Sequence, residues 1–386
     1  MKENKTYFYS VVLISLFLAL GTDGLAQGKD IQKTYAWSYN VNQDVRFTFT
    51  NYDCDLVIHT WDKNEIEYKM TVDATLRSEE DAKRLDGYIE GLEFSHSPGS
   101  AEFNNRYWQS RKNIMGKKTI DLKGEKTIRY TTYNMSGELW VPAECNLVLN
   151  SKYSGIDLED IQGSLSLDLY NDKVFGGHVR NSLKIAAKYS SLELKEVGDM
   201  EAELYNTDVE AGNIGNLSVE SKYSKFRVGN AGLVAINSYS DKYAFARTGD
   251  VTFVNKYSEL KTEASGNMTL DCYSTTLELG KVENIELKSK YGKYEVDELG
   301  NLHSSSSYSD NYKIGVLKTL NLDESKYGTY RIEQLSSSLL LKEGYSDKFF
   351  ITETGPGFKG MKVHGKYIKV ESALDAHLSF RFNARV

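Results

Sequence analysis

Tyrosine and lysine are the residues of this chain whose recurring pattern could do chemistry. Over the last two-thirds of the sequence a tyrosine returns about every 17 residues, in turn after a lysine (Lys-Tyr-Ser/Gly) and before a serine or asparagine (Tyr-Ser/Asn-Asp/Thr). Tyrosine gives a flat, rigid contact surface with a polar tip, and lysine adds a positive charge, so the pattern suits either a structural role or binding. The preferred interpretation is a structural corner at which these side chains stack, and the alternative is a ligand-binding edge. The candidate ligand edge, for a glycan or a peptide, consists of Tyr189, Tyr205, Tyr223, Tyr239, Tyr257, Tyr273, Lys222 and Lys256.

A series of apolar residues must position this edge. The number of residues between successive members of this series is more regular than the number between successive tyrosines. Alternating strands flank each corner, and a Gly-Asn or Gly-Asp step often closes the unit. Helical solenoids and β-propeller blades need longer units, so we predict an all-β fold, a single-stranded parallel β-helix of about thirteen rungs, right-handed by the usual preference of parallel crossovers. The inward apolar residue after each corner is Ile156, Val174, Leu192, Val209, Phe226, Tyr243, Leu260, Leu277, Tyr294, Tyr312, Tyr330, Phe349 and Val370.

The alternation of the corner sequences predicts how neighbouring rungs stack. A continuous column of lysines would place like charges about 4.7–4.9 Å apart, whereas alternation puts each lysine between two tyrosines. Exposed cation–π contacts of this kind contribute roughly 0.5–1 kcal/mol each. Acidic residues that follow some of the corner tyrosines are expected to balance the charge of neighbouring lysines: Asp172, Asp241, Asp310 and Asp347.

Residues 27–145 lack the repeat and are expected to form a β-rich capping region with one helix, while residues 146–386 form the repeat domain. Ser78 is the expected N-cap of the helix, and Ala82, Leu85 and Ile89 then share one apolar face. The polar segment His96–Lys117 is expected to be a loop. Strand-like alternation occurs at Arg46–Thr50, Leu56–Thr60, Ile66–Val72, Lys118–Leu122, Ile128–Tyr133 and Glu138–Val141.

The N-terminus and the charge balance indicate an exported protein. Residues 1–26 have the charged start, apolar stretch and small residues of a secretory signal peptide. The apolar run is too short to span a membrane, so the mature chain is expected in the periplasm, at the cell surface or secreted, with no membrane span; retention of this run as an anchor is the alternative. The net charge of −7, without a basic stripe, argues against nucleic acid as a partner and leaves an envelope glycan or protein.

Three cysteines in an exported chain leave at least one of them unpaired. Cys54 and Cys145 could form a disulfide, although the sequence does not give their separation. Cys272 falls in an inward column, so we expect a small buried packing residue there.

The sequence singles out no catalytic, cofactor-binding or metal-binding residues. The glycine-rich segment Gly355–Gly360 has no following helix and no βαβ unit, so we interpret it as a lengthened turn. Asp53, Asp55, His59 and Asp62 could together hold a metal, but a solvated strand face is the preferred interpretation. Because many β-helices cleave polysaccharides, a carbohydrate-active enzyme of the lyase or hydrolase type is the alternative function. The outward strand positions differ from rung to rung and reveal no acid/base pair.

The stretch Gly137–Pro142, its continuation Asn146–Leu149 and rungs of the kind Tyr153–Leu158 resemble the bacterial exported putative-adhesin β-helix families, including the head-GIN-type domain. The early segment Asp55–Asp62 looks like the opening strand of these families. The resemblance covers nearly all of the mature chain and rests on a pattern rather than on invariant residues. It implies a parallel β-helix, export, and a non-enzymatic adhesin-like role as a scaffold or binding protein of the cell envelope, and it supplies no catalytic residues.

Overall fold

The fold was determined as a computed structural model, which describes residues 28–124, 126–372 and 381–382. Contacts within the chain divide it into two compact parts, residues 1–183 and residues 184–386, and each is described by itself. The protein is almost all β, and its parallel stacked coils form a β-solenoid of about 13 turns, which confirms the predicted fold class. The expected signal peptide, residues 1–26, lies outside the described residues, and the predicted boundary at residue 145 stays a prediction.

The first part contains the one helix of the described residues and the early strands. Its elements are β1 (Lys29–Asn40), β2 (Arg46–Tyr52), β3 (Asp55–Trp61), β4 (Glu65–Leu76), α1 (Glu79–Glu90), β5 (Ser95–Ser97), β6 (Ser100–Asn104), β7 (Trp108–Ile114), β8 (Lys117–Leu122), β9 (Thr127–Pro142), β10 (Asn146–Lys152), β11 (Gly155–Leu158), β12 (Leu165–Tyr170) and β13 (Lys173–Gly176). Strand β14 (Val179–Lys188) begins here and ends in the second part.

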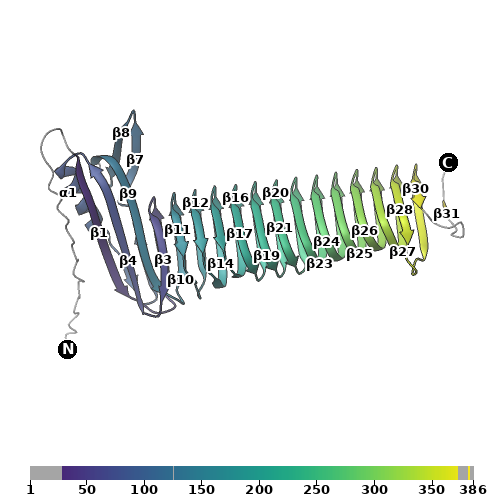
Figure 1. Ribbon diagram of the computed structural model, residues 1–386, viewed down its shortest axis with the longest axis horizontal. Coiled ribbons are helices and arrows are strands. Elements are labelled where there is room, and N and C mark those ends of the chain that lie inside the picture. The colour runs from purple at the N-terminus through teal and green to yellow at the C-terminus, as the bar shows by residue number, and fades with distance from the viewer. Residues whose placement is uncertain (1–27, 125, 373–380, 383–386) are drawn as a thin grey trace. The chain divides into compact units, whose positions relative to one another are not determined.

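The first coil of the solenoid is built by residues far apart in sequence. Strands β10 and β11 pair in parallel with β2 and β3, and the backbone N–H of Asp53 donates to the carbonyl oxygen of Lys152 at 2.9 Å. Strand β3 also pairs in parallel with β9, which is antiparallel to β4, and β4 is antiparallel to β1 (Figure 1). Residues 62–145 are therefore inserted between two stacked coils, and the corner sequence already begins at Tyr52.

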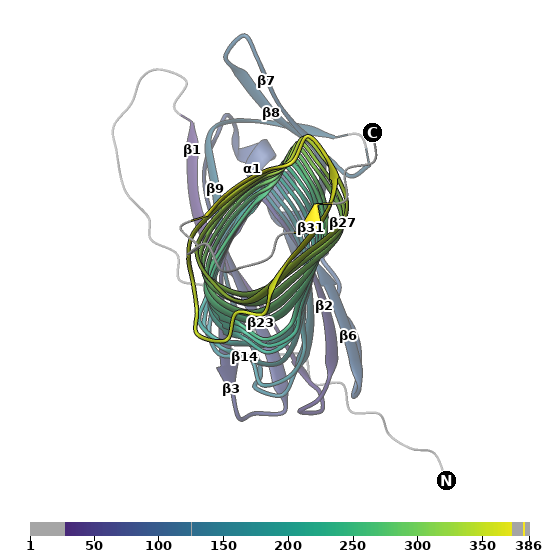
Figure 2. The ribbon, with the colours of Figure 1, turned by 90° about the vertical axis from the view of Figure 1, so that its right-hand side faces the viewer.

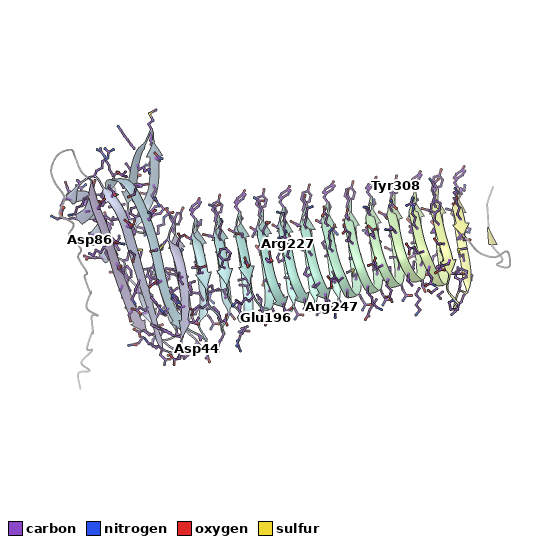
Figure 3. The ribbon with its side chains drawn as sticks, viewed as in Figure 1. Asp44, Asp86, Glu196, Arg227, Arg247 and Tyr308 are labelled. Carbon is purple, nitrogen blue, oxygen red and sulfur yellow. The ribbon has the colours of Figure 1, made fainter. Side chains whose placement is uncertain are left out.

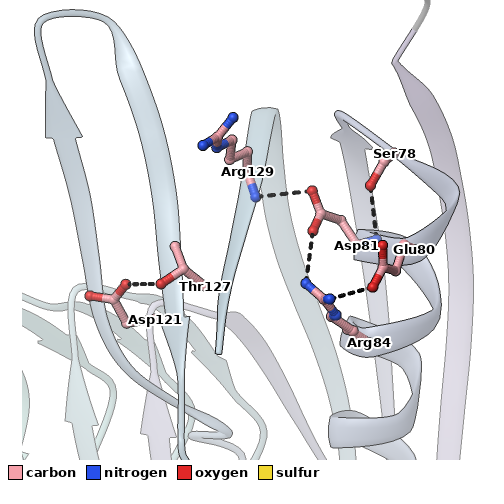
Figure 4. A network of polar contacts seen from close by, with 7 residues as sticks. All are labelled: Ser78, Glu80, Asp81, Arg84, Asp121, Thr127 and Arg129. Carbon is pink, nitrogen blue, oxygen red and sulfur yellow. Dashed lines mark hydrogen bonds and ion pairs between the residues drawn. The ribbon is translucent and has the colours of Figure 1, made fainter. Parts of the chain in front are cut away.

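Helix α1 forms where the sequence predicts it. The hydroxyl of Ser78 accepts a hydrogen bond from the backbone N–H of Asp81 at 3.1 Å (Figure 4), which satisfies one of the unpaired donors of the first turn. The carboxylate of Asp81 also accepts from the backbone N–H of Arg129 in β9 at 3.4 Å. Ala82, Leu85 and Ile89 are buried, so the apolar face fixes the helix to the sheet.

The second part is a stack of parallel coils. Its strands are β15 (Ser191–Leu194), β16 (Val197–Tyr205), β17 (Asp208–Ile214), β18 (Leu217–Lys222), β19 (Lys225–Ala231), β20 (Val234–Tyr239), β21 (Lys242–Thr248), β22 (Val251–Lys256), β23 (Glu259–Tyr273), β24 (Thr276–Lys290), β25 (Lys293–Tyr308), β26 (Asn311–Lys326), β27 (Thr329–Tyr345), β28 (Lys348–Thr354), β29 (Gly360–Lys366), β30 (Lys369–Ser372) and β31 (Arg381–Phe382). Seen along the stack, successive coils superpose as closed loops (Figure 2).

The inward apolar column predicted from the sequence is confirmed. Leu192 pairs with Val209, Val209 with Phe226 and Phe226 with Tyr243, and the same register continues to Phe349 and Val370. Every member of the column from Ile156 to Phe349 is at most 3% exposed. Aromatic members stack on one another: the ring centroids of Tyr312 and Tyr330 lie 4.6 Å apart, with the rings nearly parallel at 7°. The column is the core of each coil.

Some positions in the coils require glycine because the backbone of the preceding coil lies very close to them, and not because their φ is positive. A Cβ built on Gly280 would lie 2.2 Å from the carbonyl oxygen of Glu263, and one built on Gly300 would lie 2.1 Å from that of Glu283. Each of these oxygens belongs to the preceding coil, so a side chain at either position would force two coils apart.

One expectation about the chain is wrong, one strand was not predicted, and the open question of a disulfide is answered by the structure. The segment His96–Lys117 is not a loop, because it contains β6, β7 and the start of β8. Strand β1 was not foreseen. Cys54 and Cys145 are not bridged: all three cysteines of the chain are free and buried, and burial raises the pKa of the Cys54 and Cys145 thiols to about 12. Cys272, 3% exposed, is the packing residue expected from its column.

Candidate ligand-binding edge

Each coil turns at one residue that adopts a left-handed backbone conformation. In the second part this residue is alternately a tyrosine and a serine or asparagine, as in Tyr223 (φ 58°), Ser240 (φ 59°), Tyr257 (φ 60°) and Ser274 (φ 53°). In the register of the strands, Lys222 pairs with Tyr239, and Tyr239 pairs with Lys256. The tyrosine therefore occupies the left-handed position in one coil and the preceding position in the next, which accounts for the uneven spacing in the sequence.

Despite this offset, the tyrosine rings form one continuous column, which we call the tyrosine edge. Neighbouring ring centroids lie 5.4–5.7 Å apart and the ring planes meet at 77–82°, an edge-to-face arrangement. Figure 3 shows the row of side chains along one margin of the coils, with Tyr308 labelled. The edge consists of Tyr189, Tyr205, Tyr223, Tyr239, Tyr257, Tyr273, Tyr291, Tyr308, Tyr327, Tyr345 and Tyr367. All six predicted tyrosines belong to it.

The rings protrude to two different extents. Tyrosines at the left-handed position from Tyr189 to Tyr327 are 46–49% exposed, whereas Tyr205, Tyr239, Tyr273 and Tyr345 are 36–37% exposed. Every second ring therefore stands out further. The edge has a repeat of two coils, about 9.4–9.8 Å from the usual spacing of strands.

The expected stacking of lysine on tyrosine is largely wrong. One such contact occurs in the first part, where the Lys152 ammonium lies 5.9 Å from the centre of the Tyr170 ring. From Tyr205 to Tyr367, the described residues show edge-to-face contacts between tyrosines and no lysine over a corner ring. Because each ring is contacted by the rings of both adjacent coils, the positions that the lysines were expected to take are filled.

The corner aspartates do not balance the lysines at the surface, which is a second correction. Asp241, Asp310 and Asp347 are at most 2% exposed and point into the coil. Asp310 accepts hydrogen bonds from the backbone N–H of Gly292 at 2.6 Å and of Tyr308 at 3.1 Å, and from two serine hydroxyls. Burial raises the pKa of the Asp310 and Asp347 carboxyls. These groups therefore fix the corner from within.

The corner lysines are left without acidic partners. Among the described residues, no ion pair is formed by Lys222, Lys256, Lys290, Lys326 or Lys366. Lysines elsewhere on the coils do pair with an acid of the adjacent coil, as Lys261 does with Glu278 at 2.5 Å and Lys281 with Glu298 at 2.9 Å. The tyrosine edge is thus accompanied by uncompensated positive charge that the sequence did not reveal.

The first part carries a separate shallow groove of about 530 Å³ on the outer face of its sheet. Asp55, Lys69, Glu138, Asp157 and Phe175 contribute side chains to it from β3, β4, β9, β11 and β13. No sequence pattern indicated this groove, because its lining residues come from strands that lie far apart in the chain.

The strand face considered for a metal does not gather its residues. Asp53 forms an ion pair with Arg111, His59 contacts Glu159 at 2.9 Å, and Asp55 accepts from the backbone N–H of Gly155 at 2.8 Å. Within the described residues, no group of three or more His, Cys, Asp and Glu side chains could hold a metal ion. The segment Gly355–Gly360 connects β28 to β29, which confirms the interpretation as a turn.

Comparison with known proteins gives weak similarities. A putative lipid binding protein from Parabacteroides distasonis is 10% identical, covering 88% of this chain and 97% of that chain, with a TM-score of 0.24. A putative adhesin from the same species is 13% identical over 75% and 96% (TM-score 0.25), and one from Parabacteroides merdae is 11% identical over 89% and 97% (TM-score 0.19). No family model and no curated protein sequence matches. The resemblance to the head-GIN-type domain therefore stays a prediction.

The described part of the chain also contains no helix that is long and apolar enough to cross a membrane.

Proposed function

We propose that this chain is a non-enzymatic, exported, adhesin-like binding protein of the bacterial cell envelope, and that the tyrosine edge is its ligand surface. The observation that carries the proposal is the continuous column of half-exposed rings. Eleven tyrosines from Tyr189 to Tyr367 keep one arrangement although their sequence positions alternate. Regular coils alone would not need large aromatic side chains at the left-handed position, where serine and asparagine also occur.

The arrangement suits binding of an extended ligand. Each tyrosine presents an amphipathic ring that loses little conformational freedom on binding, and the ring is already held by its neighbours. The parallel strands keep successive rings at a fixed spacing, so many weak contacts can act on one long molecule together. Export, supported by the signal-like residues 1–26, would bring this edge to envelope or extracellular polymers.

Substitution of three rings tests the ligand surface. Tyr223→Ser, Tyr239→Ser and Tyr257→Ser together should abolish binding to an envelope glycan or protein ligand while the far-ultraviolet circular dichroism of the chain stays that of the native form. The lost ring contacts should lower the unfolding temperature, so binding is compared at a temperature at which both chains are folded. Serine already occupies the left-handed position in alternate coils, so the backbone should tolerate it. Leu233→Ser with Val316→Ser, at exposed apolar residues outside the edge, is the matched control. Equal binding by the triple variant and the native chain would refute the proposal.

The alternative of a polysaccharide lyase or hydrolase has one structural feature in its favour, since the groove of the first part brings together three carboxylates, Asp55, Glu138 and Asp157. Incubation of the purified protein with a panel of polysaccharides separates the two functions. Turnover that disappears with Asp157→Asn or Glu138→Gln would replace the binding proposal by an enzymatic one. Cell fractionation with protease treatment of intact cells would then distinguish the periplasm from the surface.

A further inference from the structure

The fold separates the two kinds of charge that the corner sequences contain. In the sequence, four of the corners that lie between lysine corners carry an aspartate, which was expected to balance the lysine charge. In the structure, Asp241, Asp310 and Asp347 face inward and are hydrogen-bonded to the backbone, whereas Lys222 and Lys256 are exposed. The surface of the tyrosine edge therefore carries lysine without the acid that accompanies it in the sequence.

This unpaired positive charge distinguishes the lysines of the tyrosine edge from several lysines elsewhere on the coils, which form ion pairs. Lysines in other columns lie beside an acid one coil away and pair with it, as in Lys184–Glu201, Lys261–Glu278 and Lys281–Glu298. The solenoid thus neutralises lysines wherever the adjacent coil offers a carboxylate. At the tyrosine edge the adjacent coil offers a tyrosine at the register position of each lysine, so the ammonium groups keep their capacity for an external anion.

The spacing of these lysines favours one shape of ligand. One lysine stands at every second coil, at intervals of about 9.4–9.8 Å, and a protruding tyrosine ring accompanies each of them. A linear polysaccharide offers C–H groups and hydroxyls to the exposed edges and phenol groups of the tyrosines and, when it contains uronic acid, carboxylates at regular intervals for the lysines. Bases of a single-stranded nucleic acid would instead need to stack on open ring faces, and the edge-to-face contacts between neighbouring tyrosines restrict that stacking.

We infer that the tyrosine edge binds a linear acidic polysaccharide, whose sugar rings contact the tyrosines and whose carboxylates pair with Lys222, Lys256, Lys290, Lys326 and Lys366. This assignment rests on the proposed function and specifies its ligand class.

The charge of the ligand can be tested without altering its rings. Binding of the chain lacking residues 1–26 is measured by calorimetry against polygalacturonate and against the methyl-esterified polymer, in which the same sugar carries no charge. The acidic polymer should bind about tenfold or more tightly, and its affinity should fall with added salt because the contacts are exposed. Equal affinity for the two polymers, or no binding of polygalacturonate at low salt, overturns the inference.

Matched lysine variants locate the charge. Lys222→Gln, Lys256→Gln and Lys290→Gln together should weaken polygalacturonate binding about tenfold, since each exposed charge pair is weak by itself and three of them are removed. Lys184→Gln, Lys261→Gln and Lys281→Gln remove the same charge from paired lysines and should leave the affinity nearly unchanged. Equal losses in both triple variants would show a non-specific charge effect and overturn the inference, as would tighter binding of single-stranded DNA or anionic lipid vesicles.

The two proposals fail in different ways. If both polymers bind equally and both are lost in the variant with Tyr223→Ser, Tyr239→Ser and Tyr257→Ser, the edge is a ligand surface but charge does not select the ligand. If that variant binds polygalacturonate as well as the native chain does, the ligand surface itself lies elsewhere.

Discussion

At the scale of single residues, the tyrosines at the left-handed corners need an explanation, because this conformation is unfavourable for a bulky side chain. Tyr223 and Tyr257 have φ values of 58° and 60°, where glycine or asparagine would cost less. Each ring makes edge-to-face contacts with two neighbours, and such pairs contribute roughly 0.5–1.5 kcal/mol each. Those contacts are of the size needed to offset a backbone cost of roughly 1–2 kcal/mol.

The buried corner aspartates make stability depend on pH. Asp172 is 1% exposed and accepts from the backbone N–H groups of Ser154 at 2.8 Å and Tyr170 at 2.9 Å; burial raises its pKa from 3.8 to about 6. A raised folded-state pKa means that the protonated form supports the fold fully below about pH 4, and that this support is lost as the pH rises through about 6. The free energy of unfolding of the native chain, relative to that of Asp172→Asn, should therefore fall by roughly 1–3 kcal/mol between about pH 4 and pH 7.

Urea unfolding at a series of pH values measures this difference. Asp157→Asn, at an exposed aspartate of the same part, is the control. It retains Asp172, so its curve of unfolding free energy against pH should run parallel to that of the native chain. If the curves of the native chain and Asp172→Asn run parallel over this range, Asp172 is not protonated on folding.

At the scale of the elements, the features that depend on the periodicity of apolar residues and on local capping could be predicted from the sequence. The inward column, the corner positions and the Ser78 cap follow from apolar alternation and local capping chemistry, and all three are confirmed. Alternation cannot say which way a corner side chain turns, so the inward Asp310 and the ring-to-ring contacts were missed. Strand β7 was missed because its polar residues are held by backbone pairing with β8 rather than by an apolar pattern. Strand β6 was missed because its alternation consists of two residues only, Ala101 and Phe103, within a polar segment.

Alanine should have opposite effects on stability at a glycine packed between two coils and at a glycine inside the helix. Gly280→Ala should lower the free energy of unfolding by roughly 1–3 kcal/mol, because its Cβ would lie 2.2 Å from the carbonyl oxygen of Glu263 and overpack the coils. Gly87→Ala, inside helix α1 with no atom within 4 Å of the added Cβ, should raise it by roughly 0.5–1 kcal/mol. Chemical denaturation of both variants checks the pair. A stable Gly280→Ala chain would mean that adjacent coils can separate locally at little cost.

At the scale of the whole molecule, the repeating unit is a pair of coils rather than one coil. Stability in stacked repeats comes mainly from each unit and its contacts with the next, so removing a complete unit is tolerated better than mismatching its neighbours. In the strand register, Lys242 pairs with Glu259 of the next coil, and Glu259 pairs with Thr276 of the coil after that. A deletion from Tyr243 to Glu259 therefore removes one coil, and a deletion from Tyr243 to Thr276 removes two, without changing the strand register.

Deletion of Tyr243–Thr276 removes two coils and keeps the alternation of corner types, whereas deletion of Tyr243–Glu259 removes one coil and places the Tyr239 and Tyr273 corners in adjacent coils. Rings in the same corner position would then meet without the offset that produces edge-to-face contacts, and Lys256 with Tyr257 would be lost.

We expect the two-coil deletion to unfold at the higher temperature, although it removes twice as many residues, and to keep the far-ultraviolet circular dichroism of the native chain. Thermal unfolding of the two deletion variants and the native chain decides this. Equal or greater stability of the one-coil deletion would show that the alternation of tyrosine and lysine serves the ligand surface alone and contributes nothing to the stacking of coils.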